Sequence, residues 1–226
     1  MSRHPADPDA LDGGTASRRL FGLYPALVKD IVDPDASGRI QVAFPWLGEV
    51  GNDVRAWARL VSLYADDDQG WQILPEVNSE VIVGFEAGAI ERPYIVGAVW
   101  NGREALPQNA EAANNKRLLK TRSGTLLEFD DSDGAAKVTL QMQSGHKLVL
   151  DDSAQSVTLK HSNGCEVVMN VAGQVKISAN STVEISASAV NVHAPIVKCD
   201  GIVQCTTLIT QSVVSASYTP GAGNVW

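Results

Sequence analysis

Short stretches of alternating apolar and polar residues fill the first half of the chain, and clusters of Gly, Pro and Asp separate them. Alternation with a period of two is typical of β-strands that bury one face. Five strands are predicted, over residues 26–32, 39–44, 56–63, 80–85 and 94–100, with an acidic loop at 66–70. Because no credible amphipathic helix accompanies them, the pattern indicates a small closed barrel.

The second half carries a weak internal repeat. Ser123-Gly124, Ser144-Gly145 and Asn163-Gly164 each precede an apolar-x-apolar pair at the same offset, and each unit closes with another such pair. Alternation within the units makes these segments strands, and the Gly and Asp-Asp steps are turns. The first pairs are Leu127/Phe129, Leu148/Leu150 and Val167/Met169; the closing pairs are Val138/Leu140, Val157/Leu159 and Val175/Ile177; later ones are Val183/Ile185 and Val190/Val192.

The spacing of these units indicates how many chains build the repeat region, which we call the needle. A single-chain β-helix needs about 18 to 25 residues per coil, and the first three units fit that period. The later apolar pairs recur roughly every six to eight residues, which is too short for a closed coil but suits one face of a rung shared by three chains. We therefore expect an all-β chain in which a barrel is followed by an intertwined, trimeric β-helix or β-prism. The expected trimer core is Leu127, Phe129, Leu148, Leu150, Val167, Met169, Val175, Ile177, Val183, Ile185, Val190 and Val192.

Composition divides the chain near residue 120, since most prolines and tryptophans lie before it and Val, Ser and Thr dominate after it. The expected organisation is a flexible arm at 1–19, the barrel at 20–102, a linker at 103–120, the needle at 121–214 and an apex at 215–226. The net charge of −8 disfavours nucleic-acid binding. Three cysteines at irregular spacing imply neither a disulfide framework nor a zinc knuckle, and neither a transmembrane helix nor a secretion signal is expected. Residues 201–226 contain no charged side chain.

Several segments of the barrel region follow one another in a recognisable order. They are Gly38 to Trp46, Trp57 to Leu60, Gly70 to Val81, Val83 to Gly88 and Arg92 to Gly102. This succession resembles the N-terminal OB-fold domain of phage baseplate assembly protein V and of the VgrG-like spike proteins of contractile tails and type VI secretion. The ending from Ser217 to Trp226 is similar to tails of phage spikes of this type. The signature residues are Phe44, Pro45, Trp46, Trp57, Gly70, Trp71, Pro75, Glu76, Gly84, Phe85, Arg92, Pro93 and Tyr94.

The resemblance implies a homotrimeric central spike that caps a tail tube and pierces the target outer membrane when the sheath contracts. It implies a separate hub protein at the OB-fold collar, and it makes a small PAAR-type tip protein a candidate partner at an apex formed by Tyr218, Val225 and Trp226. The expected location is a virion tail baseplate or phage-like particle assembled in the bacterial cytoplasm. Some relatives bind iron through a His-x-His pair, but the last histidine here, His193, has no such companion.

Candidate chemistry competes with plainer structural roles. The early tryptophans could stack bases, although acidic surroundings favour packing. Asp130-Asp131 and Asp151-Asp152 could bind calcium or cleave glycosides, but they fall at repeated turn positions where Asp suits the backbone. His146 and Cys165 follow equivalent glycines and could contribute to a metal ring, whereas Thr125 at the third such position breaks that ligand set. We predict no catalytic site, metal or cofactor.

Three classes of function follow from these observations. The leading one is a structural, membrane-piercing spike. The alternative is a single-chain β-helix that binds or cleaves polysaccharide, as tailspikes do, and the third is an OB-fold nucleic-acid module with a β-stalk. The absence of a fused hub segment favours a phage or phage-derived tail over a secretion apparatus.

Overall fold

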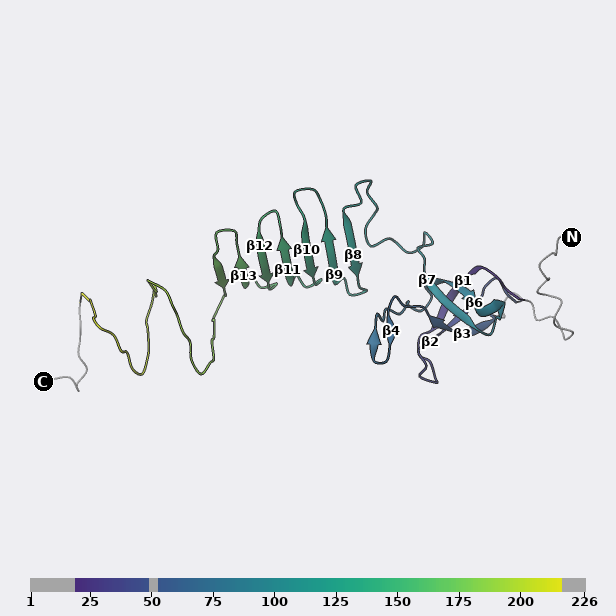
Figure 1. The fold of residues 1–226 in the computed structure, drawn as a ribbon, viewed down its shortest axis with the longest axis horizontal. Helices are drawn as coiled ribbons and strands as arrows, with labels where there is room; N and C mark the ends of the chain where they lie inside the picture. Colours follow the sequence, from purple (N-terminus) through teal and green to yellow (C-terminus); the bar gives the residue numbers. More distant parts are fainter. Residues whose placement is uncertain (1–18, 49–52, 217–226) are drawn as a thin grey trace, which may run out of the picture.

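The structure is a computed structural model that describes residues 19–48 and 53–216. Figure 1 shows a small barrel, a ladder of strands and an extended segment arranged in succession along the chain. The class is all-β, as predicted, and the one short helix among the described residues is the 3-10 turn Glu86–Gly88.

The barrel closes through five strands in the order β1-β2-β3-β7-β6. A parallel contact between β3 and β7 completes a ring whose other pairings are antiparallel. The five predicted strands are therefore present. Their bounds are β1 Leu23–Asp30, β2 Arg39–Ala43, β3 Arg55–Leu60, β6 Glu80–Phe85 and β7 Pro93–Ala98.

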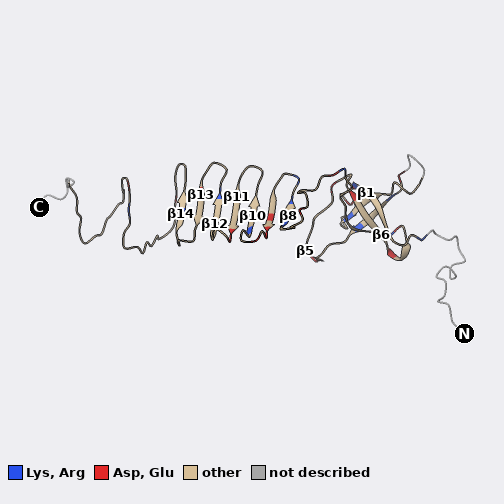
Figure 2. Cartoon of the chain, turned by 90° about the horizontal axis from the view of Figure 1, so that it is seen from above, with Lys and Arg blue, Asp and Glu red and all other residues tan. Residues whose placement is uncertain are grey.

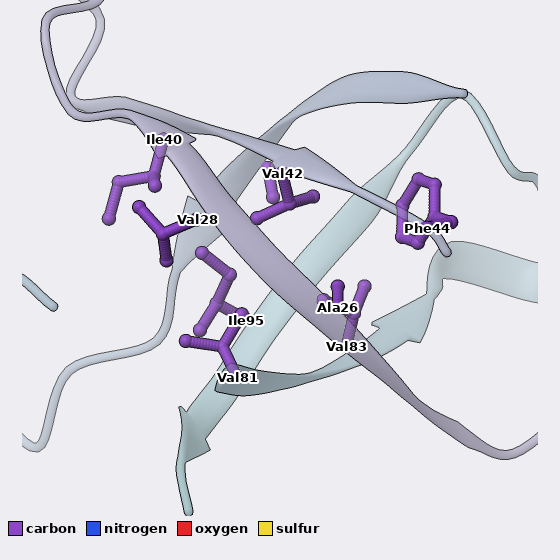
Figure 3. Close-up of a cluster of buried hydrophobic side chains, with 9 residues drawn as sticks. Ala26, Val28, Ile40, Val42, Phe44, Val81, Val83 and Ile95 are labelled. Carbon is purple, nitrogen blue, oxygen red and sulfur yellow. The ribbon is translucent and has the colours of Figure 1, made fainter. Parts of the chain in front are cut away.

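The barrel core consists of the inward-facing residues of these alternating strands. Ile40 and Val42 come from β2, Val81 and Val83 from β6, and each is at most 1% exposed. Phe44, which directly follows β2, fills one end of the interior (Figure 3). Alternation of this kind specifies the strand register, because a slip by one residue would turn every core side chain outward. The full core is Ala26, Val28, Ile40, Val42, Phe44, Ala58, Val81, Val83 and Ile95.

The segment expected as an acidic loop is instead a two-stranded hairpin of β4 (Ala65–Asp66) and β5 (Gln69–Gly70). Ser62 Oγ donates to the carbonyl oxygens of Tyr64 (2.9 Å) and Trp71 (2.7 Å), which ties the base of the hairpin together. Such short strands leave no period-two signal in the sequence.

The repeats form a seven-stranded antiparallel sheet in which each strand pairs with its sequence neighbours, from β8 to β14. Figure 1 shows the strands lying across the long axis of the sheet. All pairings within this sheet are antiparallel, so the sheet is an open meander, and the single-chain parallel β-helix of the alternative hypothesis is wrong. The strands are β8 Lys116–Lys120, β9 Leu126–Asp130, β10 Lys137–Gln141, β11 Lys147–Asp151, β12 Ser156–Lys160, β13 Glu166–Met169 and β14 Val175–Ser178.

The connection between barrel and sheet is shorter than expected, because β8 lies inside the segment assigned as a linker. In β8 the adjacent Leu118 and Leu119 point to opposite faces, which hides the alternation. Glycines close the turns on one edge of the sheet: Gly124, Gly145 and Gly164 have φ between +81° and +96°, a conformation that glycine adopts without strain.

Candidate functional site

One face of the β8–β14 sheet is almost wholly apolar. Each strand contributes two side chains to this face, and thirteen of these fourteen are apolar, with Arg117 as the exception. No described segment of the chain covers them. We call this set the apolar face: Leu119, Leu127, Phe129, Val138, Leu140, Leu148, Leu150, Val157, Leu159, Val167, Met169, Val175 and Ile177.

Exposure shows how much of this surface meets solvent. Nine of these side chains are between 37% and 62% exposed, which is unusual for apolar residues within regular strands. They are Leu119, Phe129, Leu140, Leu150, Val157, Leu159, Met169, Val175 and Ile177.

The opposite face is polar and carries charges of alternating sign. Lys116, Asp130, Lys137 and Asp151 follow one another across four strands in register. Hydrogen bonds from the Ser132 hydroxyl and amide are the main cause that lowers the pKa of Asp130, and the nearby Lys116 and Lys137 add to it. Cross-strand pairs of opposite charge stabilise a sheet.

The structure places eight of the twelve expected trimer-core residues on the apolar face, in the order the repeat predicted. Five further residues share the face but were left out of the expected core, although the same apolar-x-apolar spacing marks four of them. These are Leu119, Val138, Leu140, Val157 and Leu159.

The other four expected core residues lie in the segment after β14. Residues 179–216 contain no strand in the structure, and Val183, Ile185, Val190 and Val192 are 55–71% exposed. Figure 1 shows this stretch as an extended, bent trace. The expected apex residues Tyr218, Val225 and Trp226 lie outside the described residues.

The first carboxylate of each Asp-Asp pair is held by turn geometry. The Asp130 carboxylate accepts from the Ser132 amide (3.0 Å) and hydroxyl (2.5 Å), and the Asp151 carboxylate accepts from the Ala154 amide (2.8 Å). Hydrogen bonds to the charged form, first from Ala154 and then from Ser153, lower the pKa of Asp151. These residues therefore close turns.

His146 is brought together with a residue that the sequence did not single out. The rings of His146 and His161 lie 4.3 Å apart between centroids. Cys165 is the next residue along the same edge, since the His161 amide donates to the Cys165 carbonyl oxygen (2.8 Å). Among residues 19–48 and 53–216, no group of three or more His, Cys, Asp or Glu side chains is arranged to hold a metal.

The early tryptophans occupy different environments on the barrel. Trp46 stacks on Tyr24 at 4.7 Å and donates from Nε1 to the Pro25 carbonyl oxygen (2.7 Å), whereas Trp71 and Trp100 are more than half exposed. Trp57 lies under the Arg39 guanidinium. Of the signature residues, Phe44 and Pro93 are buried; Trp57, Pro75, Gly84, Phe85 and Tyr94 are half-buried; Pro45, Trp46, Gly70, Trp71, Glu76 and Arg92 are exposed.

A shallow cleft of about 430 Å³ on the barrel combines aromatic and charged groups. Arg59 Nη1 donates to the Tyr94 hydroxyl (3.2 Å), which lies 3.3 Å from Glu86 Oε2. At its border Arg39 forms a bidentate pair with Asp33, and the hydrogen bond from Arg39 holds the pKa of Asp33 well below its usual range. Its charges thus pair within the described part of the chain, apart from Arg59 and Glu91.

None of the described residues forms a helix long and apolar enough to span a membrane. Figure 2 shows that the charged residues lie on the barrel and along the sheet, while the extended segment is nearly free of them.

Residues 24–100 match the family described as the type VI secretion system/phage-baseplate injector OB domain. The match covers all five strands of the closed barrel except for the first residue of β1. It bears out the OB-fold resemblance.

Curated proteins of the VgrG group are similar to a longer part of the chain. The type VI secretion system spike protein VgrG1a of Pseudomonas aeruginosa is 29% identical over 134 residues, which are 54% of this chain and 21% of that protein. VgrG1b of the same organism is 26% identical over 166 residues (64% and 22%), and the actin cross-linking toxin VgrG1 of Vibrio cholerae is 24% identical over 170 residues (70% and 15%). The chain thus spans about a fifth of these relatives or less, and each alignment is longer than the barrel.

Proposed function

We propose that this chain acts as a homotrimeric, cell-puncturing spike, because residues 24–100 match the injector OB-domain family and the relatives that it resembles are named as type VI secretion spike proteins. Three barrels form a collar, and three copies of the sheet and the following segment form a needle. The needle is driven through the target envelope when a contractile sheath shortens.

The uncovered apolar face carries this proposal. Its nine most exposed side chains present about 700 Å² of apolar surface per chain, comparable with one partner's share of a standard protein interface. At about 25 cal/mol per Å², covering it contributes about 18 kcal/mol per chain before the costs of association. A surface of this size on a regular sheet favours self-association over a free monomer.

The segment after β14 favours a needle in which the chains intertwine, rather than an assembly in which two sheets merely stack face to face. Residues 179–216 are extended and contain no strand, so their backbone groups find no ladder within the chain. In a needle, strands from other copies can pair these groups and leave no open edge. Apolar residues along the segment, such as Ile202 and Val214 at 98% and 99% exposure, would then turn toward a common axis.

The distribution of charge along the chain fits a needle whose C-terminal end enters the membrane first. Residues 201–216 carry no charged side chain, whereas the barrel and sheet carry nearly all of the ion pairs. Moving a charged group from water into a membrane costs several kcal/mol of free energy, so an uncharged tip enters a membrane more readily than a charged one. We infer a structural role without enzymatic activity, in line with the relatives that are named as spike proteins.

We further propose a hub protein on the collar and a tip protein beyond residue 216 as partners, with the target outer membrane as the structure to be crossed. The particle is a phage-like contractile assembly, either a virion tail baseplate or a secretion apparatus, put together in the bacterial cytoplasm.

Light scattering of the purified chain tests the proposal. We expect a mass of about three times 24.0 kDa and a species that resists SDS until it is heated. A monomer at micromolar concentration, with the apolar face still exposed, would refute the trimeric spike.

A further inference from the structure

The two turn-bearing edges of the β8–β14 sheet differ in chemistry. Both edges extend the apolar face, because their residues lie two positions beyond its outermost side chains and continue its ladder of backbone hydrogen bonds. Over β8 to β12, the histidine edge consists of Thr121, Thr125, Met142, His146 and His161, and Cys165 follows directly before β13. The carboxylate edge consists of Asn115, Asp131, Ala136, Asp152 and Gln155.

On the histidine edge, His146 and His161 each have one ring nitrogen occupied. The Ser162 amide donates to His146 Nδ1 (3.3 Å), and the Asn163 amide donates to His161 Nδ1 (3.2 Å). A neutral imidazole whose Nδ1 accepts carries its proton on Nε2. Neither Nε2 has an acceptor among the described residues, so each ring offers an unused donor. The same tautomer argues against metal binding at these nitrogens.

On the carboxylate edge, Asp152 is the counterpart of these donors. Its amide continues the ladder by donating to the Ala136 carbonyl oxygen (3.0 Å), while its carboxylate has no hydrogen-bond or ion-pair partner within the described ranges. Asp131 on the same edge is already paired with Arg117 (2.5 Å). Asp152 and Gln155 border a hollow of about 460 Å³ that includes Leu150 and Val157 of the apolar face.

Three copies around a cyclic axis meet through heterologous contacts, in which each copy uses two different patches. Because the strands lie across the long axis of the sheet (Figure 1), the patches that meet are the two turn-bearing edges. We propose that the histidine edge of each copy docks on the carboxylate edge of the next, with His146 donating from Nε2 to the Asp152 carboxylate. This inference rests on the proposed trimer.

The two edges match strand by strand when equivalent strands stand at the same height. Polar meets polar on β8 and β9, apolar meets apolar on β10, and a donor meets an acceptor on β11 and β12. The resulting pairs are Thr121 with Asn115, Thr125 with Asp131, Met142 with Ala136, His146 with Asp152 and His161 with Gln155.

A slip by one strand, about 4.8 Å, breaks this match in either direction. In one direction Met142 faces the Asp131 carboxylate and His146 faces Ala136. In the other, Met142 faces the Asp152 carboxylate. Because it is costly to cover a carboxylate with an apolar group, the edges select the level register.

Cysteine cross-linking tests the edge pairing. In a background with Cys165, Cys199 and Cys205 changed to Ser, we combine His146→Cys with Asp152→Cys and add a short thiol-reactive cross-linker. Each chain then joins two neighbours, so we expect a covalent trimer on a denaturing gel. Thr121→Cys with Asp152→Cys is the matched control, since these residues are three strands apart, about 14 Å, and should give none.

Light scattering of the same variants before cross-linking separates the two claims. A monomer overturns the proposed function and with it this inference. If the protein is a trimer but cross-links at the control pair and not at the test pair, the edge pairing is overturned and the spike proposal stands. The same holds if a variant with only one of the two cysteines gives the cross-linked product.

A double-mutant cycle tests the hydrogen bond itself. We expect His146→Gln and Asp152→Asn each to lower the unfolding temperature of the trimer, and the double variant to fall no further than the worse single variant. Additive losses would show that the two side chains do not contact one another.

Discussion

Leu150 and Val149 are neighbours in β11 whose side chains lie on opposite faces of the sheet. Leu150 belongs to the apolar face and is 46% exposed in the single chain, whereas Val149 faces Thr139 and Thr158 on the polar face and is more buried. Truncating each to Ala therefore distinguishes a monomeric sheet from one that is covered by other copies.

The two arrangements predict opposite orders of stability. In a monomer, Leu150→Ala removes a side chain already half in water and costs about 1 kcal/mol, no more than Val149→Ala. In a trimer, Leu150 is enclosed by three sheets, and its loss costs about 2–3 kcal/mol per chain, hence about 6–9 kcal/mol for the assembly. Val149 stays on the outer surface in both cases.

Chemical unfolding followed by circular dichroism at several protein concentrations measures this difference. We expect Leu150→Ala to be clearly the less stable variant, and the midpoints of both variants to rise with protein concentration, because unfolding of a trimer includes its dissociation. Equal losses, or a larger loss for Val149→Ala at every concentration, would contradict a covered apolar face.

Two further substitutions test local features. Asp33→Asn removes a carboxylate whose pKa in the folded protein is lowered mainly by its hydrogen bond from Arg39. Such a group stabilises the folded state at pH values above the ordinary carboxyl pKa of about 3.9. This stabilisation is lost as the pH falls toward the lowered pKa of the folded state. The unfolding temperature of the wild type should thus exceed that of the variant at pH 7, and the difference should shrink below about pH 4. An equally large difference at pH 2 would refute this. Gly145→Ala, at φ +95°, should destabilise the sheet by more than about 1 kcal/mol in urea unfolding, while Ser144→Ala in the same turn should not; equal effects would exclude backbone strain as the cause.

The barrel was predictable because its strands bury one face within the same chain. Ile40, Val42 and Phe44 alternate with polar residues, and all three are buried in the core. The β4–β5 hairpin escaped prediction, since two-residue strands are held by the side-chain hydrogen bonds of Ser62, a contact that no local pattern reports.

The sheet shows where a pattern identifies strands but not their partners. The apolar-x-apolar repeat located β9 to β14 correctly, yet spacing alone could not separate a coil from a meander, since both use the same alternation. The pairing of His146 with His161 was missed because the two residues are fifteen positions apart and only the register of β11 with β12 brings them together.

Dependence on other chains increases along the molecule. Core residues of the barrel such as Val42 are fully buried by their own chain, side chains of the apolar face such as Leu150 are about half covered, and Val214 in the extended segment is 99% exposed. Antiparallel strands joined by tight turns can pair within one chain, whereas residues 179–216 do not turn back and find no such partner. In the proposed trimer, the barrel can therefore fold first, and the sheet edges can set the relative height of the three chains before the extended segments wind together. A register fixed at the edges would prevent those later segments from pairing out of step, which their nearly uniform pattern of apolar pairs could not prevent alone.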